Sequence, residues 1–148
     1  RQGTLRVLDK CEGSGFLRAA PGVGDVIPAD VTAAGKLYRA YREGAAVGAA
    51  AEHEEIVGRG YAVNRDAWID GLSVLGVPIW QGSQAGGARL AAVLALAAAS
   101  TRFKAIGEAR IASRLLAAAS AVGERLGVSS GASPRGRETR GTTPGTGE

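Results

Sequence analysis

The order of apolar and polar positions divides the chain into short strands and amphipathic helices. The strand pattern is densest in Arg59–Trp80 (RGYAVNRDAWIDGLSVLGVPIW). It predicts a short strand over Tyr61–Val63, a polar loop over Asn64–Asp70 and a longer apolar strand over Leu72–Trp80. Because proline cannot donate a ladder hydrogen bond, Pro78 predicts an edge position or a bulge near the end of that strand.

The run Arg89–Ala97 (RLAAVLALA) can be read in two ways. Alanine and leucine favour a helix on intrinsic propensity. However, the run follows the predicted strand Leu72–Trp80 and a connection, Gln81–Ala88, that contains three glycines and is typical of a hairpin. We interpret it as a buried strand, because hairpin context can override propensity.

The N-terminal part has a weaker strand pattern. Thr4–Asp9 is rich in β-formers and predicts a strand, followed by a glycine turn at Glu12–Gly15. Phe16–Arg18 could return as the second strand of a hairpin. Pro21–Pro28 predicts a loop, because proline and glycine interrupt any regular pattern there.

Three helices are predicted. Asp30 is a good N-cap for a helix over Val31–Tyr41, and Ala45–Arg59 forms a second helix that Gly60 can stop. Phe103–Leu126 shows the clearest helical period. The predicted buried faces are Val31, Ala34, Leu37, Tyr38 and Tyr41 in the first helix, and Ile111, Leu115, Ala118, Val122 and Leu126 in the last, with Glu108, Arg114 and Arg125 directed away.

One glycine falls inside the first predicted helix. Gly35 costs about 1 kcal/mol relative to alanine at such a position. It suggests the close approach of another backbone or of a ligand, although simple tolerance of glycine explains it equally well.

Length and composition point to one domain with a tail. A chain of 148 residues can bury a substantial core. We expect a domain over residues 1–128 and a disordered tail over residues 129–148, because the tail has no apolar anchor to offset its ordering entropy. The chain begins with arginine and contains no methionine, which suggests an internal or processed fragment.

Charge and hydropathy exclude some classes of partner. The net charge is +4, but the basic residues are interleaved with acids, so this chain is not expected to contact nucleic acid directly. The longest charge-free apolar run, Leu90–Thr101, is shorter than the roughly 20 residues that cross a membrane. The single cysteine, Cys11, cannot form an internal disulfide and is expected to be partly buried in a reducing cytoplasmic setting.

No residue pattern requires catalysis. The one histidine, His53, stands among glutamates and is expected on a solvated helix face, and no cluster suggests a metal site. Asp66 and Asp70 could act as paired carboxylates, but a hydrated loop explains them better. Ala34-Gly35-Lys36 lacks the other positions of a phosphate-binding loop. We therefore expect neither an enzyme nor a bound cofactor.

A sheet-and-helix domain with an apolar interior beside a polar loop suits a small-molecule pocket. The alternative is that Trp68, Leu72 and Val74 are simply core residues, since pockets and cores share composition.

Four segments in order resemble the effector-binding domain of the IclR family of bacterial transcriptional regulators. The first two are Val7–Gly15 and Val23–Pro28, the latter leading into Ala33-Ala34-Gly35-Lys36. The third is Gly60-Tyr61-Ala62 with the polar loop, Gly71 and the apolar strand, and the fourth is Glu124–Gly127. The resemblance implies an α+β, GAF-like fold: an antiparallel sheet with helices packed on it. In the family, this domain follows an N-terminal helix-turn-helix that binds DNA.

The resemblance also implies a set of pocket residues. Carried over by position, they are Ala33, Ala34, Asn64, Leu72, Val74, Leu94 and Leu96. The family often has an acid where Asn64 stands and serines near Leu94 and Leu96. Because a carboxylate buried without partners costs several kcal/mol, an apolar or aromatic effector is expected rather than a small oxo-acid.

The leading hypothesis is therefore a cytoplasmic ligand-sensing domain that self-associates as a dimer or tetramer. It would reach DNA only through the missing N-terminal helix-turn-helix and would have no membrane partner. The alternative is a GAF-like interaction or dimerisation domain without a ligand. A third option, an enzyme, would require turnover that depends on Asp66 or His53.

Overall fold

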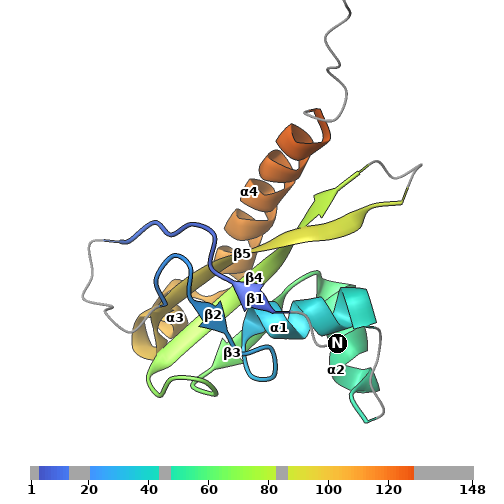
Figure 1. Cartoon of the computed structure of the whole chain (residues 1–148). Coiled ribbons are helices and arrows are strands. Elements are labelled where there is room, and N and C mark those ends of the chain that lie inside the picture. The colour runs from blue at the N-terminus through green and yellow to red at the C-terminus, as the bar shows by residue number, and fades with distance from the viewer. Residues whose placement is uncertain (1–3, 14–20, 44–47, 83–86, 129–148) are drawn as a thin grey trace, which may run out of the picture.

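The computed structural model describes residues 4–13, 21–43, 48–82 and 87–128 (Figure 1). A three-stranded antiparallel sheet in the order β3–β4–β5 forms the centre, and β1 and β2 form a separate antiparallel pair. The elements are β1 (Leu5–Arg6), β2 (Val26–Ile27), α1 (Ala33–Tyr38), the π-helical η1 (Arg39–Glu43), α2 (Ala50–Arg59), β3 (Ala62–Arg65), β4 (Leu72–Gln81), β5 (Arg89–Ala99), α3 (Ser100–Ile106) and α4 (Glu108–Val128).

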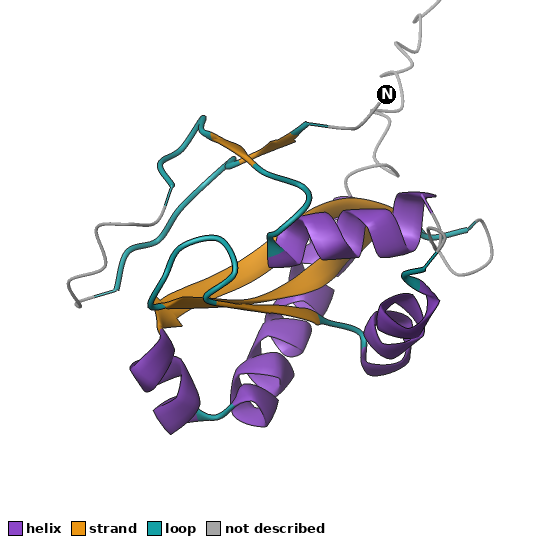
Figure 2. Cartoon of the chain, turned by 90° about the horizontal axis from the view of Figure 1, so that it is seen from below, coloured by secondary structure: helices purple, strands orange, loops and turns teal. Residues whose placement is uncertain are grey.

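Helices cover both faces of this sheet, as Figure 2 shows. On one side, α1 and η1 lie on the sheet, and α2 packs beside them through Ile56. On the other side, α3 and α4 bury Phe103 and Ile111 against the apolar side chains of β4. The predicted α+β architecture, an antiparallel sheet with packed helices, is confirmed.

The central strand β4 separates two clusters of apolar side chains. Leu75, Val77 and Ile79 point towards α4, whereas Val74 belongs to the cluster under α1. This alternation follows from the two-residue period of a strand. The α4-side cluster also contains Val63, Phe103, Ile111, Ala112 and Ala119, and the α1-side cluster contains Ala33, Leu37, Ala40, Ile56 and Ala62.

The hairpin prediction for the second half of the sheet is confirmed, but the expected burial of its second strand is wrong in part, because Ala91, Ala95 and Ala97 are exposed. Arg89–Ala97 lies within β5, which pairs with the whole of β4, from Leu72 opposite Ala99 to Gln81 opposite Arg89. The register shifts between Ile79 and Trp80, and the pairing of β4 with β3 ends at Gly76. Pro78 therefore lies next to a bulge and beyond the end of β3, as its sequence position predicted.

The N-terminal strand prediction needs correction. The strand expected over Thr4–Asp9 is reduced to β1, and its partner is β2, inside the segment expected to be a loop. A turn at Gly24, which has a φ of +92°, allows this pairing, and the Gly24 N–H donates to the Val7 carbonyl over 2.9 Å. The returning strand expected over Phe16–Arg18 lies outside the described residues.

The short strand before the polar loop is displaced from its predicted bounds. It runs over Ala62–Arg65 rather than Tyr61–Val63, so Asn64 is a strand residue. The ladder continues one step further, because the Asp66 N–H donates to the Leu72 carbonyl over 3.0 Å. The polar loop therefore begins at Asp66, which has a φ of +54°.

The first helix begins later than predicted. Its N-cap is Thr32, not Asp30, because the Thr32 hydroxyl accepts from the Gly35 N–H over 3.1 Å and donates to the Pro28 carbonyl over 2.6 Å. The buried positions are Ala33, Leu37 and Ala40. Of the predicted face, Leu37 is buried and Tyr41 packs edge-on against Trp80 with ring centroids 4.8 Å apart, whereas Val31, Ala34 and Tyr38 are only partly buried.

The second helix is described over Ala50–Arg59, and residues 44–47 of the predicted span lie outside the described residues. Gly60 ends it in the left-handed conformation with a φ of +79°, which confirms the predicted stop.

The single C-terminal helix predicted over Phe103–Leu126 is two helices. Gly107 separates α3 from α4 with a φ of +92°, a conformation that favours glycine. The predicted buried face is correct at Ile111, Leu115 and Leu126. It is wrong at Ala118 and Val122, which are exposed, and Ala119 and Gly123 lie towards β4 instead. Glu108 is half-buried rather than directed away from the core.

Two single-residue expectations can also be compared with the structure. Cys11 is exposed, so the expectation that it is partly buried is wrong. Residues 129–148 lie outside the described residues, and the disordered tail stays a prediction.

Gly35 and Gly58 offer a matched test of the helix packing. A Cβ on Gly35 would lie 1.8 Å from the Ala29 carbonyl oxygen, which explains the glycine by close backbone approach, whereas a Cβ on Gly58 meets no atom within 4 Å. Gly35→Ala should lower the free energy of unfolding by about 2 kcal/mol or more through overpacking. Gly58→Ala should raise it by up to about 1 kcal/mol through helix propensity. Urea denaturation measures both, and equal effects would contradict the packing described here.

Candidate functional site

Five of the seven predicted pocket residues gather on the α1 side of the sheet. Ala33 packs there together with Ala62 and Val74. Asn64 pairs with Val74 across β3 and β4, and it alternates in phase with Ala62, so its side chain emerges on the same side. Leu72 lies two residues before Val74 in β4, so its side chain emerges on the same side of the sheet. Ala34 follows Ala33 at the start of α1.

The remaining two, Leu94 and Leu96, point to the opposite side. They pair with Val77 and Leu75 and pack in the cluster under α4. The β5 residues that share the α1 side with Val74 are Val93, Ala95 and Ala97. The structure therefore does not bring Leu94 and Leu96 together with the other five, because the strand period places alternate residues on opposite faces.

Asn64 is the polar group of the site. Its side chain is 2% exposed, and its Oδ1 accepts from the Ala67 N–H over 3.0 Å, which fixes the start of the polar loop. Within the described residues, its Nδ2 donates no hydrogen bond. Asn64 Nδ2 is nevertheless not an unsatisfied buried donor, because the buried side-chain nitrogen left without a partner among the described residues is His53 Nδ1. Asn64 is therefore a polar side chain on this face whose amide nitrogen is not engaged by the described residues.

The first turn of α1 offers further donors. The leading N–H groups of a helix have no partner within the helix. Thr32 satisfies the N–H of Gly35 through its hydroxyl and that of Lys36 through its carbonyl, over 3.0 Å. The backbone N–H groups of Ala33 and Ala34 precede these two and have no carbonyl partner within α1.

The middle of the α1 face is filled by side chains. Leu37 is completely buried, and a Cβ on Gly76 would lie 3.2 Å from both Leu37 Cδ1 and Val93 Cγ1 and 3.5 Å from Ala33 Cβ. The absence of a side chain at Gly76 allows α1 to lie directly on β4. The candidate site is therefore limited to the end of this face near Asn64, Val74 and Leu72.

The carboxylate considered for catalysis has a structural contact. Asp66 Oδ1 accepts from the Ser100 hydroxyl over 2.6 Å, and that hydroxyl lies 2.8 Å from the hydroxyl of the buried Ser73. The Ser100 N–H also donates to the Gly71 carbonyl over 2.8 Å. These bonds attach the polar loop to the start of α3 and explain Asp66 without a reaction.

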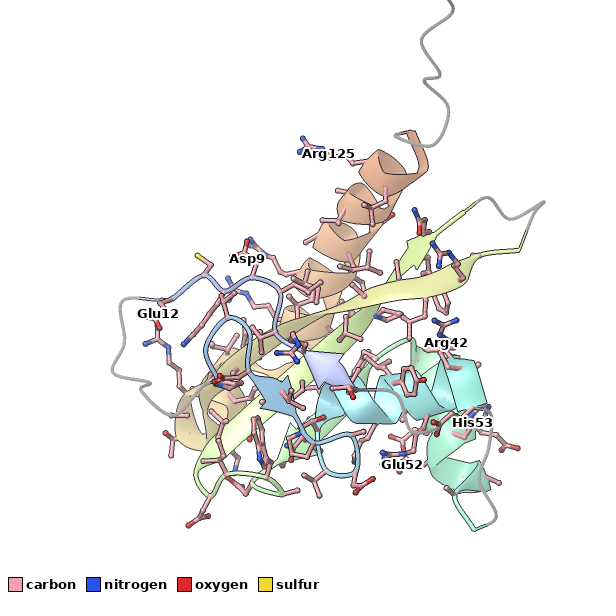
Figure 3. The ribbon with its side chains drawn as sticks, viewed as in Figure 1. Asp9, Glu12, Arg42, Glu52, His53 and Arg125 are labelled. Atoms are coloured by element: carbon pink, nitrogen blue, oxygen red, sulfur yellow. The ribbon has the colours of Figure 1, made fainter. Side chains whose placement is uncertain are left out.

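His53 differs from its predicted setting. It lies on α2 beside Glu52 (Figure 3), but the residue is only partly exposed, and its Nδ1 is buried without a hydrogen bond within the described residues. The predicted solvated helix face is therefore correct for Glu54 and Glu55, which are exposed, but only in part for His53. Its neighbour Glu52 pairs with Lys36 of α1 over 2.6 Å.

A polar network around Glu108 was not predicted from the sequence. The Tyr61 hydroxyl donates to Glu108 Oε1 over 3.0 Å, and Arg65 binds the other carboxylate oxygen. Arg59 lies over the Tyr61 ring, 4.6 Å from its centroid, and pairs with Glu55 over 2.5 Å. The network connects the end of α2, β3 and the start of α4. The helical period missed it because Glu108 follows the break at Gly107.

Within the described ranges, no group of three or more His, Cys, Asp and Glu side chains is placed to hold a metal ion. Among the described helices, none is both long and apolar enough to cross a membrane.

The comparisons with known proteins place this architecture. The sequence matches no family model and no curated protein. The structure is similar to the transcriptional regulator YaiJ, with a TM-score of 0.73 and 22% identity over 84% of this chain and 80% of the other. It is also similar to the C-terminal domain of a putative transcriptional regulator from Vibrio cholerae, with a TM-score of 0.65 and 23% identity over 76% and 74%.

A third similar structure is a putative IclR-family regulator from Rhodococcus sp., with a TM-score of 0.65 and 23% identity over 86% of this chain. The chain spans about half of that regulator, 54% of its length. These three solved structures are transcriptional regulators or a domain of one, the Rhodococcus regulator is of the IclR family, and the likeness in fold covers most of this chain. The fold is thus that of IclR-type regulators, as the sequence motifs indicated.

Glu108→Gln tests the polar network through Tyr61. Burial raises the pKa of Tyr61, and the hydrogen bond and charge of Glu108 raise it further. The folded state therefore favours the neutral phenol. Its contribution to the free energy of unfolding is fully present below the unfolded-state pKa of Tyr61, about 10, and is lost as the pH rises through the higher folded-state pKa. Removing the charge should lower the Tyr61 pKa, while burial still keeps it above the ordinary value.

The measurement is an ultraviolet titration of phenolate, with the Tyr61→Phe protein as the reference that isolates this residue. Glu124→Gln on the exposed side of α4 serves as the matched control and should leave the Tyr61 pKa unchanged. A Glu108→Gln protein with an unchanged or higher Tyr61 pKa would contradict the network.

Proposed function

We propose that this chain is the effector-binding domain of an IclR-type transcriptional regulator. The observation that carries the proposal is the likeness in fold to such regulators over most of the chain, including a C-terminal domain solved alone. In the full-length protein, an N-terminal helix-turn-helix would bind DNA. This chain would work in the cytoplasm, bind the effector and self-associate as a dimer or tetramer.

The site proposed for the effector is the Asn64 end of the α1 face. The Asn64 amide and the N–H groups of Ala33 and Ala34 would donate to an oxygen of the ligand. Val74 and the small β5 side chains Ala95 and Ala97 would supply apolar walls. Leu72 completes the proposed set, whereas the placement of Leu94 and Leu96 under α4 gives them no support as contacts.

The chemistry of these walls favours an apolar or aromatic effector with a neutral oxygen over a small oxo-acid. The donors are an amide and backbone N–H groups, and the β5 residues on this side carry neither a hydroxyl nor a charge. A carboxylate buried against them without a cationic partner would cost several kcal/mol. A neutral carbonyl or amide oxygen can accept from Asn64 without this cost.

Ligand binding would act by shifting a conformational population. An effector held between α1 and the β3–β4 loop would favour the arrangement in which both contact it. In the full-length regulator, effector binding and DNA binding would be coupled. The coupling free energy would equal the difference in effector-binding free energy between the two arrangements of the DNA-binding part.

The second candidate is a GAF-like interaction or dimerisation domain without a ligand. The direct packing of Leu37 on Gly76 favours it, because this packing fills the centre of the α1 face with the chain's own side chains.

A thermal-shift titration separates these functions. Neutral aromatic probes such as benzamide and indole should raise the melting temperature by several degrees near saturation, since a ligand at about 100 times its Kd adds about 2.7 kcal/mol. Small oxo-acids such as pyruvate and glyoxylate should not. Asn64→Leu should abolish the shift with benzamide, because the benzamide carbonyl oxygen would lose the hydrogen-bond donor of the Asn64 amide.

Val57→Ala, at an exposed position on α2, is the control variant and should respond like the unchanged protein. A response to oxo-acids alone would exclude the apolar effector. No response to either set, with the protein folded, would favour the interaction domain.

A further inference from the structure

The loop between β3 and β4 begins with an unusual backbone conformation. Asp66 has a φ of +54°, and among the described residues it is the only non-glycine residue with a positive φ. Residues with a side chain rarely adopt this region, although aspartate and asparagine tolerate it best. Such a conformation persists only where the surrounding structure holds it. The contacts of Asp66 therefore identify what fixes the loop.

A chain of hydroxyl groups holds the Asp66 side chain. The Ser100 hydroxyl donates to Asp66 Oδ1 over 2.6 Å, which leaves the Ser73 hydroxyl, 2.8 Å away, as the donor to Ser100. Ser73 is 2% exposed and lies on the central strand β4. A hydrogen bond from a hydroxyl to a carboxylate is shorter and stronger than one between neutral groups. The chain of hydrogen bonds thus runs from the buried strand to the exposed loop and ends on a carboxylate.

Ser100 also fixes the other end of the loop. Its N–H donates to the carbonyl of Gly71, the last loop residue, over 2.8 Å. Asp66 is exposed, so its bond to Ser100 competes with water. The backbone bond to Gly71 keeps the Ser100 hydroxyl beside the carboxylate, and the start of α3 therefore holds both ends of the loop.

The conformation of Asp66 determines where the Asn64 amide points. Asn64 Oδ1 accepts from the Ala67 N–H over 3.0 Å, and the peptide between Asp66 and Ala67 sets the direction of that N–H. A change in the backbone dihedrals of Asp66 would turn this peptide and break the bond. Because Oδ1 and Nδ2 belong to one planar amide group, a fixed Oδ1 also fixes the direction of Nδ2.

We propose that Asp66 and Ser100 are positioning residues for the effector site. Their hydrogen bond holds the β3–β4 loop in the conformation that directs the Asn64 amide at a neutral oxygen of the ligand. Ser73 alternates with Val74 on β4, so the hydroxyl chain lies on the α4 side of the sheet, and Asn64 lies on the α1 side. This inference rests on the effector site proposed above and adds to it two residues that do not touch the ligand.

Amide hydrogen exchange followed by NMR tests the positioning without a ligand. Asp66→Ala and Ser100→Ala each remove one partner of the hydrogen bond. Both should speed exchange of the Ala67 N–H about fivefold after correction for intrinsic rates, because its bond to Asn64 opens more often. The amides in the middle of β4 should keep their protection, which separates a local effect on the loop from a loss of global stability.

Two control variants change the same loop. Asp66→Asn retains an oxygen acceptor and tolerates the positive φ, so Ala67 should exchange as slowly as in the unchanged protein. Asp70→Ala removes an exposed carboxylate that has no hydrogen bond or ion pair within the described residues, and it should leave the exchange of Ala67 unchanged. Circular dichroism establishes that each variant is folded.

Calorimetric titration with benzamide measures the consequence for binding. Asp66→Ala and Ser100→Ala should each weaken benzamide binding about fivefold, whereas Asp66→Asn and Asp70→Ala should bind like the unchanged protein. The double variant D66A/S100A should bind as weakly as either single variant, because both changes remove the same hydrogen bond.

Three outcomes would overturn the positioning role. The first is an exchange rate of Ala67 that stays unchanged in both alanine variants. The second is faster exchange throughout β4, which would mean a purely structural role. The third is benzamide binding that Asp66→Ala and Asp70→Ala weaken equally. An unchanged protein that does not bind benzamide would instead refute the proposed effector site, and the exchange of Ala67 would then decide alone whether the Asp66–Ser100 contact sets the loop.

Discussion

The burial of β4 on both faces is the constraint on which the rest of the structure depends. On one face, Leu75, Val77 and Ile79 pack under α4, and on the other α1 lies directly over Gly76. Such a strand cannot be stable without a helix on each side, because either face alone would expose apolar surface to water. Two glycines make this layering possible, because the absence of a Cβ lets the neighbouring element pack closely. A Cβ on Gly76 would press on Leu37, and a Cβ on Gly123 would lie 2.7 Å from the Trp80 carbonyl oxygen.

Polar side chains act mainly at the ends of these layers. Thr32 caps α1, Asn64 at the end of β3 binds the backbone of the polar loop, and Ser100 joins that loop to α3. Each hydrogen bond fixes the point at which one element passes into the next. Asn64 differs from the other two because only its Oδ1 is engaged by the described residues, which leaves its Nδ2 as a donor for the proposed ligand.

Most of the fold could be predicted from the sequence, because its strongest signals are local. The glycines around Gln81–Ala88 identified β5 as a strand although its alanines favour a helix. The break at Gly107 could not be predicted with the same method, since one glycine within a helical period is often tolerated. The wrong assignment of Ala118 and Val122 arises within α4 itself. The buried stripe continues from Leu115 in four-residue steps to Ala119 and Gly123, and alanines at both 118 and 119 leave the sequence pattern unable to choose between them.

The candidate site was harder to predict, because it depends on the pairing register. Transfer of positions from the IclR family placed Leu94 and Leu96 beside Asn64, but the observed register pairs Leu96 with Leu75 and turns both leucines towards α4. A one-residue difference in register exchanges the two faces of a strand. Sequence pattern alone cannot detect it in β5, where nearly every residue is apolar.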